Sequence, residues 1–411
     1  MSVIIVCFMA LIYPFSALRP VPEVAGAVAA VPYDVVNAQE ARALASGNPL
    51  SFLHVSRAEI DLPAEADHYA DAVYERAAEN FRDLRARAPL VEEDAATFYV
   101  YQLQMGSHVQ TGVAACFAID EYDNDLIKKH EKTRPDKEDD RTRHMIAISA
   151  QTGPVFLTYA ASAAIDAVVS ATANERPLFD FTAPDGVRHR IWTMPAADHD
   201  ALVAGFAALP SLYIADGHHR AASAARARQA LAGRGPGEQD RVLAVAFPDN
   251  QMQILPYNRV IRDLSGMTPA QFVDRLSQQM TITAAQSTPA QKGHAAMYLD
   301  GKWYSLDWSG AARAKSGIAA LDVSMLQDIV LEPLLGIADV RTDKRIDFVG
   351  GIRGAAELER LVDSGAFAVA FLLFPVTVSD LMEVSDAGGI MPPKSTWFEP
   401  KLRDGLLSHL I

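Results

Sequence analysis

The segment from Leu212 to Arg228, L-Y-I-A-D-G-H-H-R-A-A-S-A-A-R-A-R, constrains the fold more than any other part of this chain. Its first four residues are apolar and predict a short buried strand, and the alanine-rich and arginine-rich run from Ala221 predicts a helix. Asp216-Gly217 predicts a tight turn between them. A strand that turns directly into a helix leaves the first N–H groups of the helix unpaired, at the positive end of its dipole. The segment therefore predicts an anion-binding turn within an α/β fold.

The side chains at this turn suit phosphate or carboxylate. His218, His219 and Arg220 supply hydrogen-bond donors, and Asp216 can orient a histidine or hold a cation. The alternative is that Asp216 only caps the helix and that the other three side chains form a solvated surface. We favour a site, because ionisable side chains gathered at such a turn more often belong to one. We predict Asp216, His218 and His219 as catalytic residues, and Gly217 and Arg220 as binding residues.

Composition limits the kind of ligand. The chain has 411 residues and a formal charge of -14, so it offers no general basic surface for nucleic acid. The expected partner is a small anionic molecule or a nucleotide. Only Cys7 and Cys116 are present, without the spacing of a zinc site or a disulfide framework, which indicates a reducing cytoplasm. No metal ligands are identified.

The pattern of elements predicts an α/β fold, with mixed α+β possible, in which a smaller second lobe accompanies the strand-turn-helix site. Residues 1–12 are expected to be an apolar extension or a first strand, because the run is too short to span a membrane and lacks a basic start. The linker-like stretch at 233–239 separates an α/β region at 13–232 from another at 240–411.

Several local patterns predict individual elements. Asn37 and Gly47 predict the two ends of a helix from Ala38 to Ser46. Alternating residues predict hairpins within 97–119 and 179–194. Residues 51–56 predict a strand, and the apolar run 242–247 predicts a strand buried on both faces.

A charged stretch around His130-Glu131-Lys132-Thr133 is a second candidate region. Pro135 follows it closely, so we expect one helix to end at these residues and the next to begin at Asp136. Such a stretch is most often a wet helix face. Concentrated at a helix junction, however, Glu131 could act as a base and Lys132 could neutralise phosphate charge, if they lie near the turn.

The C-terminal region offers two further groups. Asn258 and Arg259 follow a predicted strand, where ligands commonly bind. Between prolines, Lys394, Ser395 and Thr396 form a rigid polar loop suited to an anion, although it lacks the glycine-rich start of a Walker motif. The alternative is that the following aromatic residues wedge this loop into the core. We predict all five residues as cofactor-binding.

These motifs together resemble one family over nearly the whole chain. They are V-P-Y-D-V-V at 31–36, S-F-L-H-V at 51–55, H-E-K-T at 130–133, D-G-H-H-R at 216–220, P-Y-N-R at 256–259 and P-K-S-T at 393–396. The set is similar to the bacterial and archaeal domain-of-unknown-function family 1015. The D-G-H-H-R segment by itself also resembles the ParB/sulfiredoxin superfamily, which includes free-serine kinases. That resemblance implies that the glycine turn and its helix hold nucleotide phosphates.

The leading hypothesis is a nucleotide-dependent small-molecule phosphotransferase, with a free-serine kinase as its most specific form. It would use ATP or ADP together with Mg²⁺. One alternative is a phosphoester hydrolase in which His218 and His219 hold a metal, although no third ligand stands at a diagnostic spacing. The other is a non-catalytic regulatory protein that binds an anion or nucleotide at the same turn.

Overall fold

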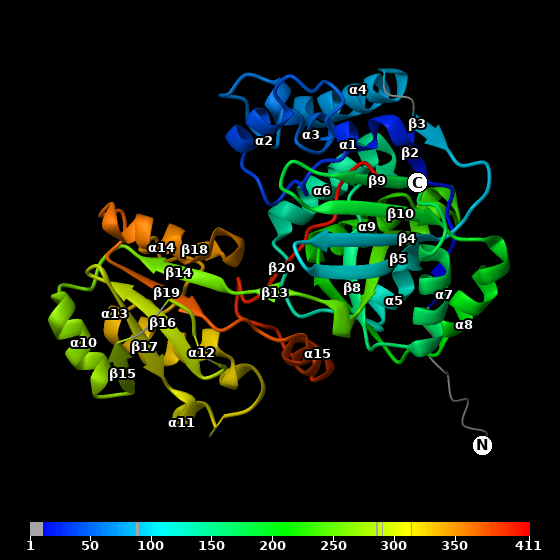
Figure 1. Cartoon of the computed structure of the whole chain (residues 1–411). Coiled ribbons are helices and arrows are strands. Elements are labelled where there is room, and N and C mark those ends of the chain that lie inside the picture. Colours follow the sequence, from blue (N-terminus) through cyan, green and yellow to red (C-terminus); the bar gives the residue numbers. More distant parts are fainter. Residues whose placement is uncertain (1–10, 88–89, 285–286, 290, 314) are drawn as a thin grey trace. The chain divides into compact units, whose positions relative to one another are not determined.

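A computed structural model describes residues 11–87, 90–284, 287–289, 291–313 and 315–411 (Figure 1). It confirms the mixed α/β fold. The chain forms two compact units: unit 1 comprises the described residues up to Met252 together with Pro400–Ile411, and unit 2 is Gln253–Glu399. The linker-like stretch at 233–239 lies inside unit 1. The segment expected as an extension or first strand lies outside the described residues up to position 10, and strand β1 follows at Ile12–Tyr13.

Unit 1 is built on a mixed sheet of nine described strands. Its order is β6-β11-β8-β12-β5-β4-β10-β9, and β1 also pairs with β5. Both predicted hairpins are present as antiparallel pairs, β4 with β5 and β9 with β10. The remaining bounds are β4 (Tyr99–Met105), β5 (His108–Ala118), β6 (Ile127–Lys128), β8 (Val155–Tyr159), β9 (Phe179–Thr182), β10 (Arg188–Thr193), β11 (Leu212–Asp216) and β12 (Arg241–Pro248).

Helices pack against this sheet through apolar faces. Ala221, Ala224 and Ala225 of α9 join the sheet core, and their small side chains let the helix lie close to the strands. Every β12 residue from Val242 to Pro248 is buried, as predicted for a strand covered on both faces. The helices are α5 (Ile119–Asp123), α6 (Pro135–Ile148), α7 (Ala163–Ala173), α8 (His199–Ala207) and α9 (His218–Ala230).

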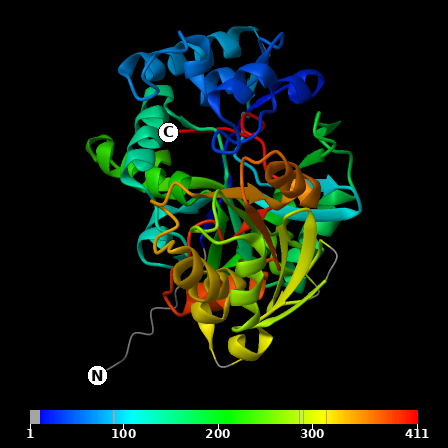
Figure 2. The same cartoon turned by 90° about the vertical axis from the view of Figure 1, so that its left-hand side faces the viewer.

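A group of N-terminal helices has its own core within unit 1. They are α1 (Ala25–Val28), α2 (Ala38–Ala45), α3 (Leu53–Ser56) and α4 (Asp71–Arg87), with β2 (Leu18–Pro20) pairing β3 (Leu90–Glu92). In both views the C-terminus lies beside this group, drawn in blue (Figures 1 and 2). There β21 (His409–Leu410) pairs β7 (Ala150–Gln151). The end of the chain is thus part of the unit that contains its beginning.

Two local predictions in unit 1 are wrong. Residues 53–56 form helix α3 and not a strand, because the pattern of so short a segment fits either structure and the neighbouring helices decide. The charged stretch does not end a helix: it is a loop between β6 and α6. Ile127 and Lys128 pair in parallel with Leu212 and Tyr213, a contact between segments far apart in the sequence that no local pattern reveals.

Unit 2 contains a six-stranded antiparallel sheet of order β15-β17-β16-β19-β14-β18. Leu358 of α14 shares a core with Val260, Ala296 and Ala370 of the sheet. The strands are β13 (Ile254–Leu255), β14 (Tyr257–Ile261), β15 (Thr281–Ala284), β16 (His294–Leu299), β17 (Lys302–Asp307), β18 (Ile346–Gly350), β19 (Val369–Leu373) and β20 (Trp397–Phe398). The helices are α10 (Pro269–Ser277), α11 (Ser309–Ala312), α12 (Asp322–Leu326), α13 (Glu332–Leu335), α14 (Gly354–Asp363) and α15 (Val378–Asp386). Across the described ranges, no helix has the length and apolar character needed to cross a membrane.

Candidate functional site

The predicted strand-turn-helix is present as β11, Gly217 and α9. Gly217 has φ +94°, in the left-handed region that a residue with a side chain adopts at a cost. The helix begins at His218, earlier than the alanine run indicated, so His218, His219 and Arg220 form its first turn. These residues therefore stand at the positive end of the α9 dipole.

Arg220 is buried and turns back over the glycine. Its Nη1 donates to the carbonyl of Pro154, and its Nη2 lies 3.3 Å from Oδ2 of Asp216. A Cβ placed on Gly217 would stand 2.9 Å from Nε and Cζ of this guanidinium. The glycine is therefore required twice, for its backbone conformation and for the space that Arg220 fills.

Asp216 is held as a carboxylate by two cations. Lys401, from the C-terminal segment, places Nζ 3.3 Å from Oδ2 of Asp216, beside Arg220. Burial of Asp216 opposes ionisation, but Lys401 and Arg220 outweigh it and hold the pKa of this carboxyl well below its usual range. A carboxylate with so low a pKa is a poor proton acceptor, which argues against Asp216 as a general base.

The H-E-K-T loop lies against the turn. The backbone N–H of His130 donates to Nε2 of His218 at 3.3 Å, and the two rings meet edge to face at 4.4 Å. Oε2 of Glu131 lies 3.8 Å from Nδ1 of His218, and Lys132 is exposed. Burial lowers the pKa of His130 to about 4 and that of His218 well below its usual value. Both imidazoles are therefore neutral near pH 7.

His219 is half-buried and is oriented by the same loop. The backbone N–H of Arg134 donates to its Nε2 at 3.0 Å, so the neutral ring carries its proton on Nδ1. Burial lowers the pKa of His219. His219 can thus donate a hydrogen bond from Nδ1 to an anion without being charged itself.

The two predicted groups of the C-terminal region come together within unit 2. Nη2 of Arg259 donates to the carbonyl of Lys394 at 3.1 Å, and Nζ of Lys394 lies over the ring of Tyr257. Burial lowers the pKa of the Arg259 guanidinium to about 10. Asn258 and Ser395 are buried: the Asn258 side chain accepts from the Leu373 N–H, and the Ser395 hydroxyl donates to the carbonyl of Pro392. Thr396 is half-buried.

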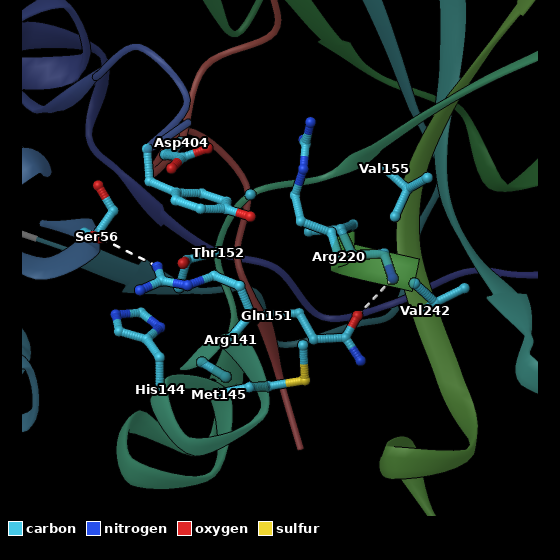
Figure 3. A pocket seen from close by; sticks show the side chains of 14 residues that line it. Ser56, Arg141, His144, Met145, Gln151, Thr152, Val155, Arg220, Val242 and Asp404 are labelled. Carbon is cyan, nitrogen blue, oxygen red and sulfur yellow. Dashed lines mark hydrogen bonds between the residues drawn. The ribbon is translucent and has the colours of Figure 1, made fainter. Parts of the chain in front are cut away.

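Sequence reasoning missed three residues of unit 1 that surround the turn. Lys401 contacts Asp216, while Arg141 and Asp404 line a small cavity that Arg220 also lines (Figure 3). Three charged residues in K-L-R-D at 401–404 could have indicated that this segment belongs to a site, but nothing local indicates that the end of the chain returns to unit 1. Tyr33, from the V-P-Y-D-V-V motif at 31–36, also lines this cavity.

Within the described residues, no group of three or more His, Cys, Asp or Glu side chains is placed to hold a metal ion. No curated protein matches this chain.

Several solved structures are similar to it at low identity. A conserved hypothetical protein from Pyrococcus furiosus is 15% identical, with a TM-score of 0.35, over 73% of this chain and 95% of the other. A free serine kinase in complex with AMP is 13% identical, with a TM-score of 0.35, over 72% and 92%. C-terminally truncated SbnI from Staphylococcus aureus is 13% identical, with a TM-score of 0.40, over 72% and 87%. At these scores the likeness carries no argument about function.

The family comparison covers most of the chain. The sequence profile described as protein of unknown function (DUF1015) matches residues 12–324, which include the H-E-K-T, D-G-H-H-R and P-Y-N-R motifs. This confirms the resemblance drawn from the motifs, and the chain belongs to the DUF1015 family.

Proposed function

We propose that this protein is a nucleotide-dependent phosphotransferase that acts on a small hydroxylated molecule, with the nucleotide phosphates held at the β11–α9 turn. The observation that carries the proposal is the placement of Lys401 and Arg220 on one oxygen of Asp216, beside the first turn of α9. Lys401 and Arg220 bring two positive charges to one carboxylate oxygen, next to a helix N-terminus. Both features favour a phosphate there.

The residues at the turn divide the work of phosphoryl transfer. The N–H groups of the first turn of α9 and Nδ1 of His219 would donate to phosphate oxygens, while Lys401 and Arg220 offset charge. The substrate hydroxyl oxygen bonds to the terminal phosphorus, the bond from that phosphorus to the leaving nucleotide oxygen breaks, and the hydroxyl proton passes to a carboxylate. Glu131 suits this last role better than Asp216, because its side chain is 42% exposed, whereas two cations hold Asp216 ionised.

Magnesium is expected with the nucleotide. Mg²⁺ usually needs only one or two protein carboxylates when phosphates supply its other ligands. Glu131 and Asp216 both lie beside the turn, and with Glu131 taking the proton, Asp216, which stays ionised, would be the carboxylate that holds Mg²⁺. A nucleotide-dependent reaction agrees with the cytoplasmic location predicted from the cysteines. Free serine is the first substrate to test, because the D-G-H-H-R segment resembles a superfamily that includes free-serine kinases.

Calorimetric titration with ATP and with ADP, each with Mg²⁺, tests the proposal. We expect saturable binding that His219→Ala weakens at least tenfold. His68→Ala is the matched control, because this exposed histidine of unit 1 lies outside the site. A product assay with serine then tests transfer. Binding without transfer would point to a regulatory protein, release of inorganic phosphate to a hydrolase, and no nucleotide binding at millimolar concentration would end the proposal.

A further inference from the structure

A tight turn at residues 32–35, within the V-P-Y-D-V-V motif, has no role in the phosphate site described so far. The N–H of Val35 donates to the carbonyl of Pro32 at 3.2 Å, so Tyr33 and Asp34 occupy the central positions of the turn. Nη1 of Arg57 donates to the carbonyl of Tyr33 at 3.0 Å, which fixes the backbone between these two residues. The position of Asp34 is therefore set by the folded chain.

Tyr33 packs this turn against the start of α9. Its side chain is buried and lines the small cavity that Arg220 also lines, and Arg220 belongs to the first turn of α9 (Figure 3). Cζ of Arg141, on the same cavity wall, stands 4.2 Å from the centre of the Tyr33 ring. Asp34 follows Tyr33 directly and is exposed. It thus lies at the surface beside the β11–α9 turn.

The charge of Asp34 acts on both side chains of α9 that the phosphate site uses. Burial lowers the pKa of His219, and of the charges around this ring Asp34 opposes the shift most. Burial also disfavours the charged form of Arg220, but Asp216 and then Asp34 outweigh it, so the pKa of Arg220 is raised. Because Coulomb energy falls with distance, these effects agree with the packing: Asp34 lies near the first turn of α9.

Asp34 has no partner for its charge. Among the residues that the structure describes, its carboxylate has no hydrogen bond and no ion pair, whereas Asp216 faces Lys401 and Arg220. An unpaired carboxylate beside a phosphate site repels the phosphate unless a cation lies between them. Mg²⁺ is typically bound in this way, by one or two carboxylates together with phosphate oxygens. The exposed, unpaired carboxylate of Asp34 fits this role.

We infer that Asp34 is a metal-binding residue of the nucleotide site, and that its carboxylate holds the Mg²⁺ that accompanies the nucleotide phosphates. The inference rests on the proposed function and adds a second carboxylate to Asp216. Two cations already offset the charge of Asp216, so Asp34 supplies the negative charge that attracts a divalent cation. With the metal bound, Asp34 favours the nucleotide; without the metal, its charge opposes the nucleotide.

Binding of ADP with and without the metal tests this change of sign. ADP is titrated calorimetrically into the full-length protein, once with EDTA and once with excess Mg²⁺. We expect Mg²⁺ to tighten ADP binding to the unaltered protein about tenfold or more. Asp34→Asn keeps the shape of the side chain and removes its charge, so it should lose most of this gain. The variant should bind metal-free ADP as tightly as before or about twofold tighter, because exposed charges interact weakly in water.

Two further variants serve as controls. Asp34→Glu retains the carboxylate and should retain part of the gain from Mg²⁺. Asp94→Asn removes the same charge from an exposed loop before β4 in unit 1 and should leave both affinities unchanged. Mn²⁺ binding in the presence of ADP, followed by electron paramagnetic resonance, is a second readout, and Asp34→Asn should weaken it about tenfold or more.

An equal loss of ADP affinity with and without Mg²⁺ in Asp34→Asn would overturn the inference, as would an unchanged gain from Mg²⁺ in this variant. The absence of any gain in the unaltered protein would also overturn it, and that comparison stands even if the variant fails to fold. No ADP binding under either condition would reject the phosphotransferase. ADP binding that does not depend on Mg²⁺ would reject only the metal-binding role of Asp34.

Discussion

Two aspartates that both lie near Arg220 have opposite protonation behaviour. Asp216 faces Lys401 and Arg220 directly, which holds its pKa below the usual range, whereas burial raises the pKa of Asp404, which has no ion-pair partner, to about 7. Both residues are aspartates, so the difference between their pKa values comes from how directly a cation faces each carboxyl. Asp216 is therefore a fixed anion, whereas the Asp404 carboxyl gains or loses its proton near pH 7.

The raised pKa of Asp404 predicts a pH dependence of stability. The unfolded chain releases this proton near pH 4 and the folded protein only near pH 7, so the folded state holds more protons in that window. This carboxyl thus lowers the free energy of unfolding as pH rises from about 4 to about 7. We expect Asp404→Asn to gain stability relative to the unaltered protein over this window, measured by urea unfolding at about pH 4 and about pH 8. Parallel curves for the two proteins would contradict the assignment.

At the scale of elements, the β11–α9 turn combines a structural and a chemical role. Arg220 points back toward Pro154 and Asp216, and it fixes the start of the helix against the loop before β8. His219 faces the H-E-K-T loop instead. His219 is consequently the better residue for testing ligand binding, because removing Arg220 would also take the donor from the Pro154 carbonyl and leave Asp216 with Lys401 alone.

Gly217→Ala tests this turn as an element. The alanine Cβ would require a left-handed backbone and would stand 2.9 Å from the Arg220 guanidinium. We expect a loss of roughly 1–3 kcal/mol in the free energy of unfolding, together with weaker nucleotide binding. Gly233→Ala is the control, since its Cβ meets nothing within 4 Å, and it should change stability by no more than about 0.5 kcal/mol. Equal effects of the two substitutions would show that the turn is not strained.

At the scale of the whole molecule, the chain leaves unit 1 after Met252 and returns to it at Pro400. The returning segment contributes Lys401 to Asp216, Arg403 to Asp185 and β21 to β7. Its residues from Leu402 to His409 are all buried. The last twelve residues are therefore part of the core of the first unit.

Truncation after Glu399 should accordingly destabilise unit 1 and spare unit 2. We expect calorimetry to show the unfolding transition of unit 1 shifted strongly downward or lost, while that of unit 2 persists. Lys401→Ala removes the contact with Asp216 without shortening the chain and should keep both transitions while weakening nucleotide binding. A truncated chain that unfolds like the complete one would show that the returning segment is not part of the core.

The sequence by itself determined the features that depend on neighbouring residues. Asn37 caps α2 as predicted, with its side chain accepting from the Glu40 N–H at 2.9 Å, because a cap is set by residues three apart. The two hairpins and the buried strand β12 follow from alternation and from a continuous apolar run. The β11–α9 turn was readable because strand, glycine and helix lie within seventeen consecutive residues, Leu212 to Arg228.

Tertiary structure alone decided which charges meet. Asp216 and Lys401 are 185 positions apart, and no local pattern could pair them. The same holds for the cavity, whose lining runs from Tyr33 to Asp404, and for the short segment that forms α3 beside other helices. The physical reason is that propensity and capping act between near neighbours, whereas burial and Coulomb energies depend on distance in space, which only the folded chain sets.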